Sequence, residues 1–510
     1  MLSQIYSFGL TGIDGFPVRV QTDISNGLVA FEIVGLPDAA VKEAKERVRA
    51  AVKNSGFRFP AKRVVVNLAP ANKRKEGSGY DLPITVSLLA ATEQFDTGDI
   101  EKTMFIGELS LDGSVNSVSG VLPRVISAYE QGFERVFVPC DNADEAAVVE
   151  GIEVYPVKNL KELFMHFSGE KQILPRKIDV SAMFSQKLLS LLDFCDVKGQ
   201  ENIKRALEIA AAGSHNVLLI GSPGTGKTML AQRMSGILPD LTFDEALEVT
   251  KIHSIAGILP KDKPLISQRP FRSPHHTISS VGLSGGGTIP RPGELSLAHN
   301  GILFLDELPE FSRSALEVLR QPLEDGKVTI SRVNATLTYP CNIMLIASMN
   351  PCKCGFLGDS RRQCTCTPAQ INRYRSKISG PLLDRIDIQV EVAGVDYDDL
   401  SSAEKGETSA EIKKRVDRTR KIQLERYKDR GIYSNSQLTA GMLTEFCPLG
   451  EDENMILKAA FDNLGLSARA HSRILKVART IADLEMSENI RTEHIAEAIQ
   501  YRSLDRKFFE

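Results

Sequence analysis

One short segment constrains the fold of this chain more than any other: a glycine-rich loop between an apolar run and a helical pattern. It fits the phosphate-loop pattern GxxxxGK[ST] at every fixed position. Residues 217–220 are typical of a buried strand, and residues 229–235 have helical spacing. This order predicts an α/β domain with a parallel sheet. The loop residues are Gly221, Ser222, Pro223, Gly224, Thr225, Gly226, Lys227 and Thr228.

The residue types of the loop indicate its ligand. Glycines permit a tight turn that points backbone N–H groups at phosphate oxygens, and the following helix N-terminus attracts negative charge. Lys227 can reach the β- and γ-phosphates, and the Thr228 hydroxyl can ligate Mg²⁺. We therefore expect a nucleoside triphosphate and Mg²⁺ at this loop.

Polar residues follow two more apolar runs. Asp306 and Glu307 come after residues 302–305, so we expect Asp306 to hold Mg²⁺, directly or through water, and Glu307 to polarise the attacking water. Asn350 comes shortly after the run at 343–347. It is either a residue that positions the water or senses the γ-phosphate, or a simple strand-end cap.

Length and composition exclude several classes of protein. A chain of 510 residues exceeds one ordinary core and predicts two to four domains. Hydrophobic residues at 42% and charged residues at 25% exclude a mainly disordered chain. No window approaches the roughly 18 apolar residues of a membrane span, and residues 1–10 lack a secretory pattern, so we expect a cytoplasmic protein. A net charge of -3 requires any nucleic-acid site to be local.

Residue patterns divide the chain into three blocks. Residues 1–170 mix strand and helix patterns and predict an α+β domain, followed by a polar linker at 171–192. Residues 193–398 alternate strands and helices, and residues 399–510 have helical spacing throughout. The elements expected in the first block are strands at 28–36, 63–68 and 135–138 and helices at 39–54, 82–92 and 121–131.

Four of the eight cysteines are clustered just after the 343–347 run. Cys352, Cys354, Cys364 and Cys366 form a CxC…CxC set, and four thiolates on one short loop suit tetrahedral Zn²⁺. Metal-free thiols and a redox role are the alternatives. The single cysteines are interpreted as core residues: Cys140, Cys195, Cys341 and Cys447.

Three longer strings carry a resemblance to a known family. GELSLAHNGILFLDE at 293–307, LLDRID at 382–387 and RPFRSPHH at 269–276 resemble the Mg-chelatase-like AAA+ ATPases of the YifB/ComM family, and the resemblance runs through nearly the whole chain. It implies ATP and Mg²⁺ as cofactors, an AAA+ core with an all-helical lid, and a homohexameric ring with active sites shared between subunits.

The same resemblance implies roles for arginines. Arg385 matches the family's arginine finger, which reaches the neighbour's γ-phosphate; the alternative is a surface arginine paired with Asp384 or Asp387. Arg473 matches the lid arginine called sensor 2, and Arg469 is its rival.

The first domain resembles a different protein. Residues 108–123 and 74–83 resemble the Lon-protease-like domain with the ribosomal S5 fold. Lon proteases use a Ser–Lys dyad, but here the nucleophile position falls on Gly79, one place after Ser78, and the lysine position on Leu122. Because covalent catalysis needs a nucleophile beside its base, we interpret the domain as a non-proteolytic scaffold or a nucleic-acid-facing ring.

Basic residues suggest where a substrate binds. Residues 327–338 alternate like a hairpin. The resemblance to Mg-chelatase-like ATPases implies that an insertion at this place points into a ring pore, where Lys327 and Arg332 could track a phosphate backbone. Two other basic segments are the loop at 73–75 and the run at 411–430. Each either contacts phosphate or is an ordinary solvated segment. His275 and His276, in an insertion at about 251–292, are hydrogen-bonded structural imidazoles or metal ligands.

Two classes of function remain open at this stage. The family resemblance implies a DNA motor, a branch-migration helicase that acts on branched or single-stranded DNA in recombination or natural transformation. The alternative is an ATP-driven remodeller of the Mg-chelatase type that acts on a partner enzyme. A Lon-type protease is disfavoured because the dyad is absent.

Overall fold

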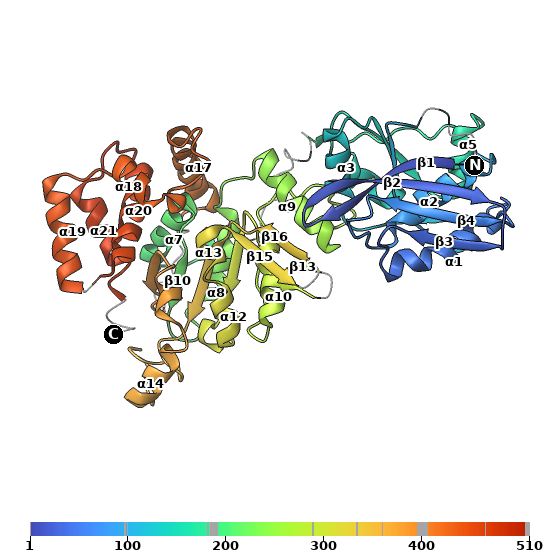
Figure 1. Cartoon of the computed structure of the whole chain (residues 1–510). Helices are drawn as coiled ribbons and strands as arrows, with labels where there is room; N and C mark the ends of the chain where they lie inside the picture. The colour runs from blue at the N-terminus through green and yellow to red at the C-terminus, as the bar shows by residue number, and fades with distance from the viewer. Residues whose placement is uncertain are drawn as a thin grey trace. The chain divides into compact units, whose positions relative to one another are not determined.

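The computed structural model describes residues 2–504, except 96–97, 99, 181–182, 184–191, 288–289, 333–334, 360, 395–405 and 465. The chain forms two compact units, which can be followed by colour in Figure 1. The first contains residues 1–187 and 243–267, and the second contains residues 188–242 and 268–510. The sequence pattern places 243–267 in the phosphate-loop domain, whereas in the structure this segment folds with the N-terminal unit.

A seven-stranded sheet forms the first unit, in the order β3-β4-β2-β1-β5-β8-β9. Strands β1 and β2 make a long antiparallel hairpin that was not predicted, although burial alternates along β2. The strands predicted at 63–68 and 135–138 are confirmed within one residue. The bounds are β1 Leu2–Thr11, β2 Asp14–Ser25, β3 Ala30–Val34, β4 Arg63–Ala69, β5 Thr103–Phe105, β8 Arg135–Pro139 and β9 Glu153–Val157.

Helices cover this sheet with apolar side chains. Asp38 caps the N-terminus of helix α1 (Ala39–Asn54), since its carboxylate accepts from Val41 N at 2.8 Å. Helices α2 (Asp81–Ala91) and α3 (Val121–Glu130) are buried along most of their length. Helix α9 (Phe243–Ala256) joins them, because Gly120 N donates to the Ser254 carbonyl at 3.0 Å.

The second unit contains a five-stranded parallel sheet in the order β11-β14-β17-β10-β18. All residues of β10, β14 and β17 are buried, which confirms the prediction of parallel strands covered on both faces. Helices α7 (Glu201–Gly213) and α8 (Lys227–Arg233) come directly before and after β10 in the sequence. The strands are β10 Val217–Ile220, β11 Phe271–Arg272, β14 Ile302–Leu305, β17 Met344–Met349 and β18 Ile388–Glu391.

The C-terminal part of this unit is helical where described, as predicted. The predicted domain boundary at 398/399 lies outside the described residues, as does much of the predicted linker. None of the helices in the described part of the chain combines the length and apolar character needed to cross a membrane. The C-terminal helices are α17 Ser409–Arg426, α18 Ala440–Phe446, α19 Glu451–Leu464, α20 Ala468–Leu484 and α21 Thr492–Gln500.

Candidate nucleotide-binding site

Three adjacent strands bring the predicted site residues to one edge of the second sheet. Strand β17 lies between β10 and β14, and all three run parallel. The phosphate loop follows β10, Asp306 follows β14, and Asn350 follows β17. The carboxyl edge of an open parallel sheet is the usual ligand-binding edge, because loops from neighbouring strands converge there.

Lys227 begins helix α8 and is directed into the loop that precedes it. Its Nζ donates to the carbonyl oxygens of Gly221 (2.7 Å) and Ser222 (2.9 Å) and to Asn350 Oδ1 (3.2 Å). Burial lowers the pKa of Lys227, while attraction to Asp306 opposes this effect. The lysine therefore touches both the phosphate loop and the end of β17.

Thr228 and Asp306 are in direct contact. The Thr228 hydroxyl donates to Asp306 Oδ2 at 2.8 Å. Ser348 donates to the other carboxylate oxygen of Asp306, and its own oxygen accepts from Glu307 N at 3.3 Å. A hydroxyl and a carboxylate at this separation suit Mg²⁺, which prefers oxygen ligands. No role was predicted for Ser348; the only sequence signal was its place near the end of a buried strand.

Glu307 has an unusual backbone for a residue with a side chain. Its φ of 54° lies in the left-handed region, which turns the chain sharply after β14. Glu307 Oε2 lies 3.9 Å from His276 Nδ1, and the His276 ring is 4.1 Å from that of His275. His276 thus faces the acid that was predicted to polarise water.

A cavity of about 800 Å³ lies beside the phosphate loop. Its walls come from the loop itself, from the segment before α7, from the end of β18 and from residues 351–362. This volume is in the range of small-molecule and cofactor sites. Gln200 spans two of these walls, because its Nε2 donates to the carbonyls of Thr225 (3.1 Å) and Ala393 (3.0 Å).

Arg385 is nearly buried and is held within its own subunit. Its guanidinium donates to the carbonyls of Arg320 (2.6 Å) and Pro381 (2.7 Å) and contacts the Glu324 carboxylate. The ion-pair partner is thus Glu324, rather than the expected alternatives Asp384 or Asp387.

The two candidate lid arginines have different surroundings. Arg473 NH1 donates to the buried Asp387 at 2.7 Å, and Asp387 Oδ2 also lies 3.4 Å from the buried His215. Attraction to Arg473, with a smaller contribution from His215, holds the pKa of Asp387 well below its usual range, against the opposing effect of burial. Arg469 is 58% exposed and lies 3.6 Å from Asp384. Arg473 is therefore part of a buried charge network, and Arg469 is the more accessible cation.

The four clustered cysteines come together. Their sulfur atoms all lie within 4.8 Å of one another, and the three pairs among Cys352, Cys354 and Cys364 are 3.4 to 3.6 Å apart. A tetrahedral Zn²⁺ with bonds of about 2.3 Å requires sulfur atoms about 3.8 Å apart. The donor set and its spacing therefore fit this ion.

The predicted hairpin at 327–338 is present as β15 (Lys327–Arg332) and β16 (Ala335–Pro340). Hydroxyls line its exposed face, where Thr329 lies 3.2 Å from Thr338 and Ser331 lies 3.2 Å from Thr336. The backbone of Arg332 pairs with Ala335, but its side chain lies outside the described part of the structure.

Lys73 and Arg74 of the 73–75 loop are exposed as expected, but Lys75 is not. Lys75 is completely buried, its Nζ donates to the Lys73 carbonyl at 2.8 Å, and burial lowers its pKa. Arg74 pairs with Glu76 at 3.4 Å, and Lys73 Nζ lies 4.4 Å from the centroid of the Phe16 ring. A solvated or phosphate-binding role is therefore wrong for Lys75, because chain packing leaves its ammonium no access to solvent.

In the first unit, the positions compared with the Lon dyad carry no such pair. Leu122 is a fully buried apolar side chain, and Gly79 is buried. Ser78 Oγ donates to the Glu108 carboxylate. A carboxylate partner and an apolar side chain at the lysine position do not form a nucleophile and base.

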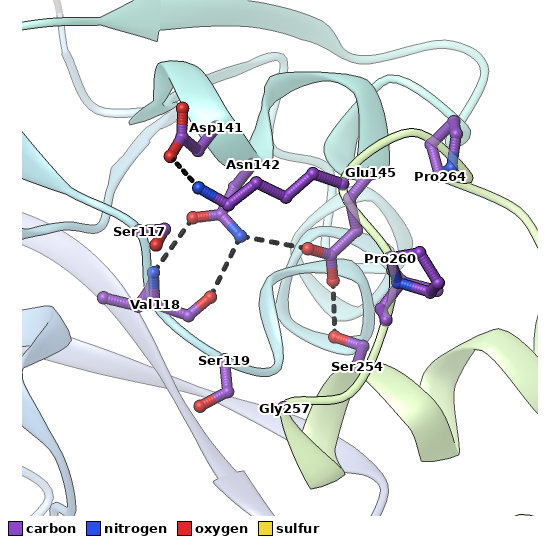
Figure 2. Close-up of a pocket in the computed structure, with 12 residues that line it drawn as sticks. Ser117, Val118, Ser119, Asp141, Asn142, Glu145, Ser254, Gly257, Pro260 and Pro264 are labelled. Atoms are coloured by element: carbon purple, nitrogen blue, oxygen red, sulfur yellow. Dashed lines mark hydrogen bonds and ion pairs between the residues drawn. The ribbon is translucent and has the colours of Figure 1, made fainter.

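A smaller cavity of about 290 Å³ lies in this unit, where α9 and the residues after it meet the α3 region (Figure 2). Asn142 exchanges two 3.0 Å hydrogen bonds with the Val118 backbone and donates to Glu145 at 3.1 Å. Glu145 in turn accepts from Ser254 Oγ (Figure 2). These polar groups satisfy one another, which indicates that they anchor the 243–267 segment.

The parallel sheet and its strand-end residues define a phosphate-loop nucleotide-binding domain, and the family profiles assign it to the AAA+ ATPases of the magnesium-chelatase type. Three family profiles match: "Magnesium chelatase, subunit ChlI" at residues 193–400, "Subunit ChlI of Mg-chelatase" at 20–142, and "Magnesium chelatase, subunit ChlI C-terminal" at 406–502. The chain belongs to the YifB/ComM family of Mg-chelatase-like ATPases, as the full-length relatives below show.

Similarity to these relatives covers nearly the whole chain. YifB of Salmonella typhimurium is 45% identical over 507 residues, which are 99% of this chain and 98% of the relative. The competence protein ComM of Haemophilus influenzae is 43% identical over 513 residues, with the same coverage. The magnesium-chelatase 38 kDa subunit of Rhodobacter capsulatus is 24% identical over 336 residues, 61% of this chain and 86% of the relative.

Proposed function

We propose that this protein is a ring-forming ATPase that moves branched or single-stranded DNA, a branch-migration helicase that serves recombination or natural transformation. The observation that carries ATP hydrolysis is the convergence of Lys227, the Thr228–Asp306 pair and Glu307 at one sheet edge. Lys227 would bind the β- and γ-phosphates, and Asp306 with Thr228 would hold Mg²⁺. Glu307 would accept a proton from the attacking water.

Two observations support DNA as the substrate. The β15–β16 hairpin presents exposed hydroxyls beside Lys327, and hydroxyl and ammonium groups both bind phosphate oxygens. One full-length relative is named a competence protein. A homohexamer would repeat the hairpin around a pore, so that a chain with net charge -3 still provides a local cationic surface.

A second candidate is an ATP-driven remodeller that acts on a partner protein. The observation that favours it is that all three matching profiles derive from the ChlI subunit of magnesium chelatase. Zinc in the cysteine cluster is proposed for either candidate, as a structural ion that folds residues 352–366.

ATP turnover with different additives separates the two candidates. We expect forked and four-way DNA to stimulate turnover several-fold over the rate without DNA, and single-stranded DNA of equal length to do so less. Blunt duplex DNA at the same nucleotide concentration is the control. Stimulation by a copurifying protein, with no response to any DNA, would favour the remodeller.

A further inference from the structure

The accessible side of helix α1 carries a row of positive charges. The helix packs beside β3 at one edge of the first unit's sheet (Figure 1) and buries its apolar side chains there. The spacing of the cations by three or four residues places them on the opposite side of the helix, along about 16 Å of its length. Glu46 is the acidic residue within this row. The cations of the row are Lys42, Lys45, Arg49 and Lys53.

The loop between α1 and β4 continues this positive surface. Residues 55–62 include Arg58 and Lys62 and contain no acidic residue. The Arg49 guanidinium lies 5.1 Å from the centroid of the Phe59 ring, which fixes the loop beside the end of the helical row. The row and the loop therefore form one surface, which we call the α1 patch: Lys42, Lys45, Arg49, Lys53, Arg58 and Lys62.

The charge of this segment differs in sign from that of the whole chain. Residues 39–63 contain eight Lys/Arg and two Asp/Glu, so their net charge is +6, whereas the chain has a net charge of -3. A strong local excess of cations on one helix face and its adjoining loop is the electrostatic feature of a surface that binds a polyanion.

Most cations of the α1 patch have no carboxylate partner. In the described part of the chain, ion pairs within this segment are made by its other arginines: Arg47 with the buried Asp81 at 2.6 Å, and Arg63 with Glu32 at 3.5 Å. Like charges three or four residues apart on a helix repel one another. A bound anion would relieve this repulsion, so the charge of the α1 patch is available to a ligand.

The phosphate backbone of duplex DNA fits this surface better than other polyanions do. The 16 Å row spans about five phosphates of one duplex strand, which follow one another every ~3.4 Å along the axis. Single-strand sites need exposed aromatic faces for base stacking. Here Phe59 packs against Phe31 with ring centroids 5.4 Å apart, and Phe57 packs against Phe164 at 5.3 Å. A protein interface would have an apolar core with few charges.

We propose that the α1 patch binds the phosphate backbone of a duplex arm of DNA, without base specificity. This inference rests on the proposed DNA-motor function and deepens it, because it adds a site for the duplex part of a branched substrate. The β15–β16 hairpin and the α1 patch then bind different parts of that substrate, a single strand and a duplex arm.

The test replaces Lys42, Lys53 and Lys62 together by Gln in the full-length protein. Affinity for blunt duplex DNA should fall about tenfold or more, and by the same factor for duplexes of different sequence. The salt dependence of binding should become shallower by about two to three log units per log unit of salt, because each duplex phosphate contact contributes about 0.9. Fluorescence anisotropy of labelled duplexes over a range of salt concentrations measures these effects. Basal ATP turnover should not change.

Three exposed lysines of the same unit supply a control variant with the same loss of charge: Lys102, Lys158 and Lys161. Their replacement by Gln should leave duplex affinity unchanged. Arg at the three substituted patch positions should retain affinity, because the positive charge remains. Glu46→Gln should tighten binding, since it removes the acid from the row, and a gain of affinity does not arise from misfolding. Thermal unfolding of each variant checks its fold.

Binding and turnover distinguish two kinds of failure. Wild-type duplex affinity in the Gln variant of the α1 patch, or an equal loss in the control variant, would overturn the inference even if forked DNA still stimulates ATP turnover. If no DNA stimulates turnover of the wild type, the motor function is wrong, while a specific loss of duplex binding still supports the α1 patch. A Gln variant that loses binding to poly-glutamate but not to duplex DNA would assign the surface to an acidic protein and overturn the inference.

Discussion

At the scale of single residues, Glu307 has an energetically unfavourable backbone conformation that neighbouring residues hold in place. A left-handed conformation costs a non-glycine residue roughly 1 to 2 kcal/mol, and here it follows directly from the turn after β14. Such strain persists where the surrounding structure fixes it, and Ser348 does so through the Glu307 amide. His276 Nδ1 lies 3.9 Å from the Glu307 carboxylate.

Glu307→Gln is expected to lower ATP turnover by about 100-fold or more, because an amide cannot accept the proton of the attacking water. Nucleotide should remain bound, since Lys227 and Asp306 are untouched. Steady-state turnover and nucleotide retention after gel filtration measure both effects. Glu310→Gln is the control, because Glu310 pairs with Lys377 at 3.3 Å outside the strand-end cluster. Normal turnover in Glu307→Gln would assign the base elsewhere.

Arg469 and Arg473 should differ in what their removal changes. Arg473→Ala leaves the buried Asp387 without its closest cation, so we expect the protein to be destabilised by about 3 kcal/mol, measured by urea unfolding. Arg469→Ala should change stability by less than about 0.5 kcal/mol, since Arg469 is exposed. If Arg469 is the lid arginine, its removal lowers turnover in a stable protein. Full turnover in Arg469→Ala would return that role to Arg473.

At the scale of elements, helix α17 and the β15–β16 hairpin compete as DNA-binding surfaces. Residues 411–430 carry nine Lys/Arg and four Asp/Glu. Much of this charge is paired within the chain: Arg426 with Asp483 at 2.6 Å, Arg430 with Glu445 at 2.8 Å, and Arg415 with Glu407. The hairpin instead exposes hydroxyls, with Val328 and Ile330 buried on its other face.

Replacing Lys327 and Arg332 together by Ala should abolish DNA-stimulated turnover and spare the basal rate. The salt dependence of DNA binding should also become shallower, by about 0.7 to 0.9 log units per log unit of salt for each phosphate interaction that the change removes. Lys414→Ala with Lys421→Ala removes the same charge from exposed positions of α17. If this second pair abolishes stimulation and the first does not, α17 is the DNA-binding element.

At the scale of the whole molecule, the proposed ring would place Arg385 of one subunit against the nucleotide site of the next. Within its own chain Arg385 is tied to Glu324 and two carbonyls. Arg385→Ala and Lys227→Ala should each lower turnover by about 1000-fold, the scale of an arginine finger. Mixing the two should restore measurable turnover, because one mixed interface joins an intact pocket to an intact finger.

A second mixture controls for this rescue. Lys227 and Glu307 both belong to the nucleotide pocket of their own subunit. In a mixture of Lys227→Ala and Glu307→Gln every pocket is therefore defective, and no recovery is expected. Turnover in both mixtures would point to contaminating activity, and turnover in neither would contradict a shared site.

Features that depend on neighbouring residues could be predicted from the amino-acid sequence. Strands β10 and β14 lie where the apolar runs predicted them, and helix α1 has the predicted bounds, because strand burial and helix spacing appear within a few residues. The phosphate-loop motif likewise predicted its strand–loop–helix context. Resemblance to a family added the expectation of an AAA+ core followed by helices.

Contacts between segments that are far apart in the sequence, in contrast, could be identified only from the folded structure. Residues 243–267 follow the phosphate loop in sequence yet pack with the N-terminal unit, and Lys75 looks like a surface residue but is buried. The contacts of Ser348 with Asp306 and of Gly355 with Pro223 depend on strand order and loop packing. Contacts between residues far apart in the chain are selected by the packing of the whole core, and one-dimensional patterns do not record that packing.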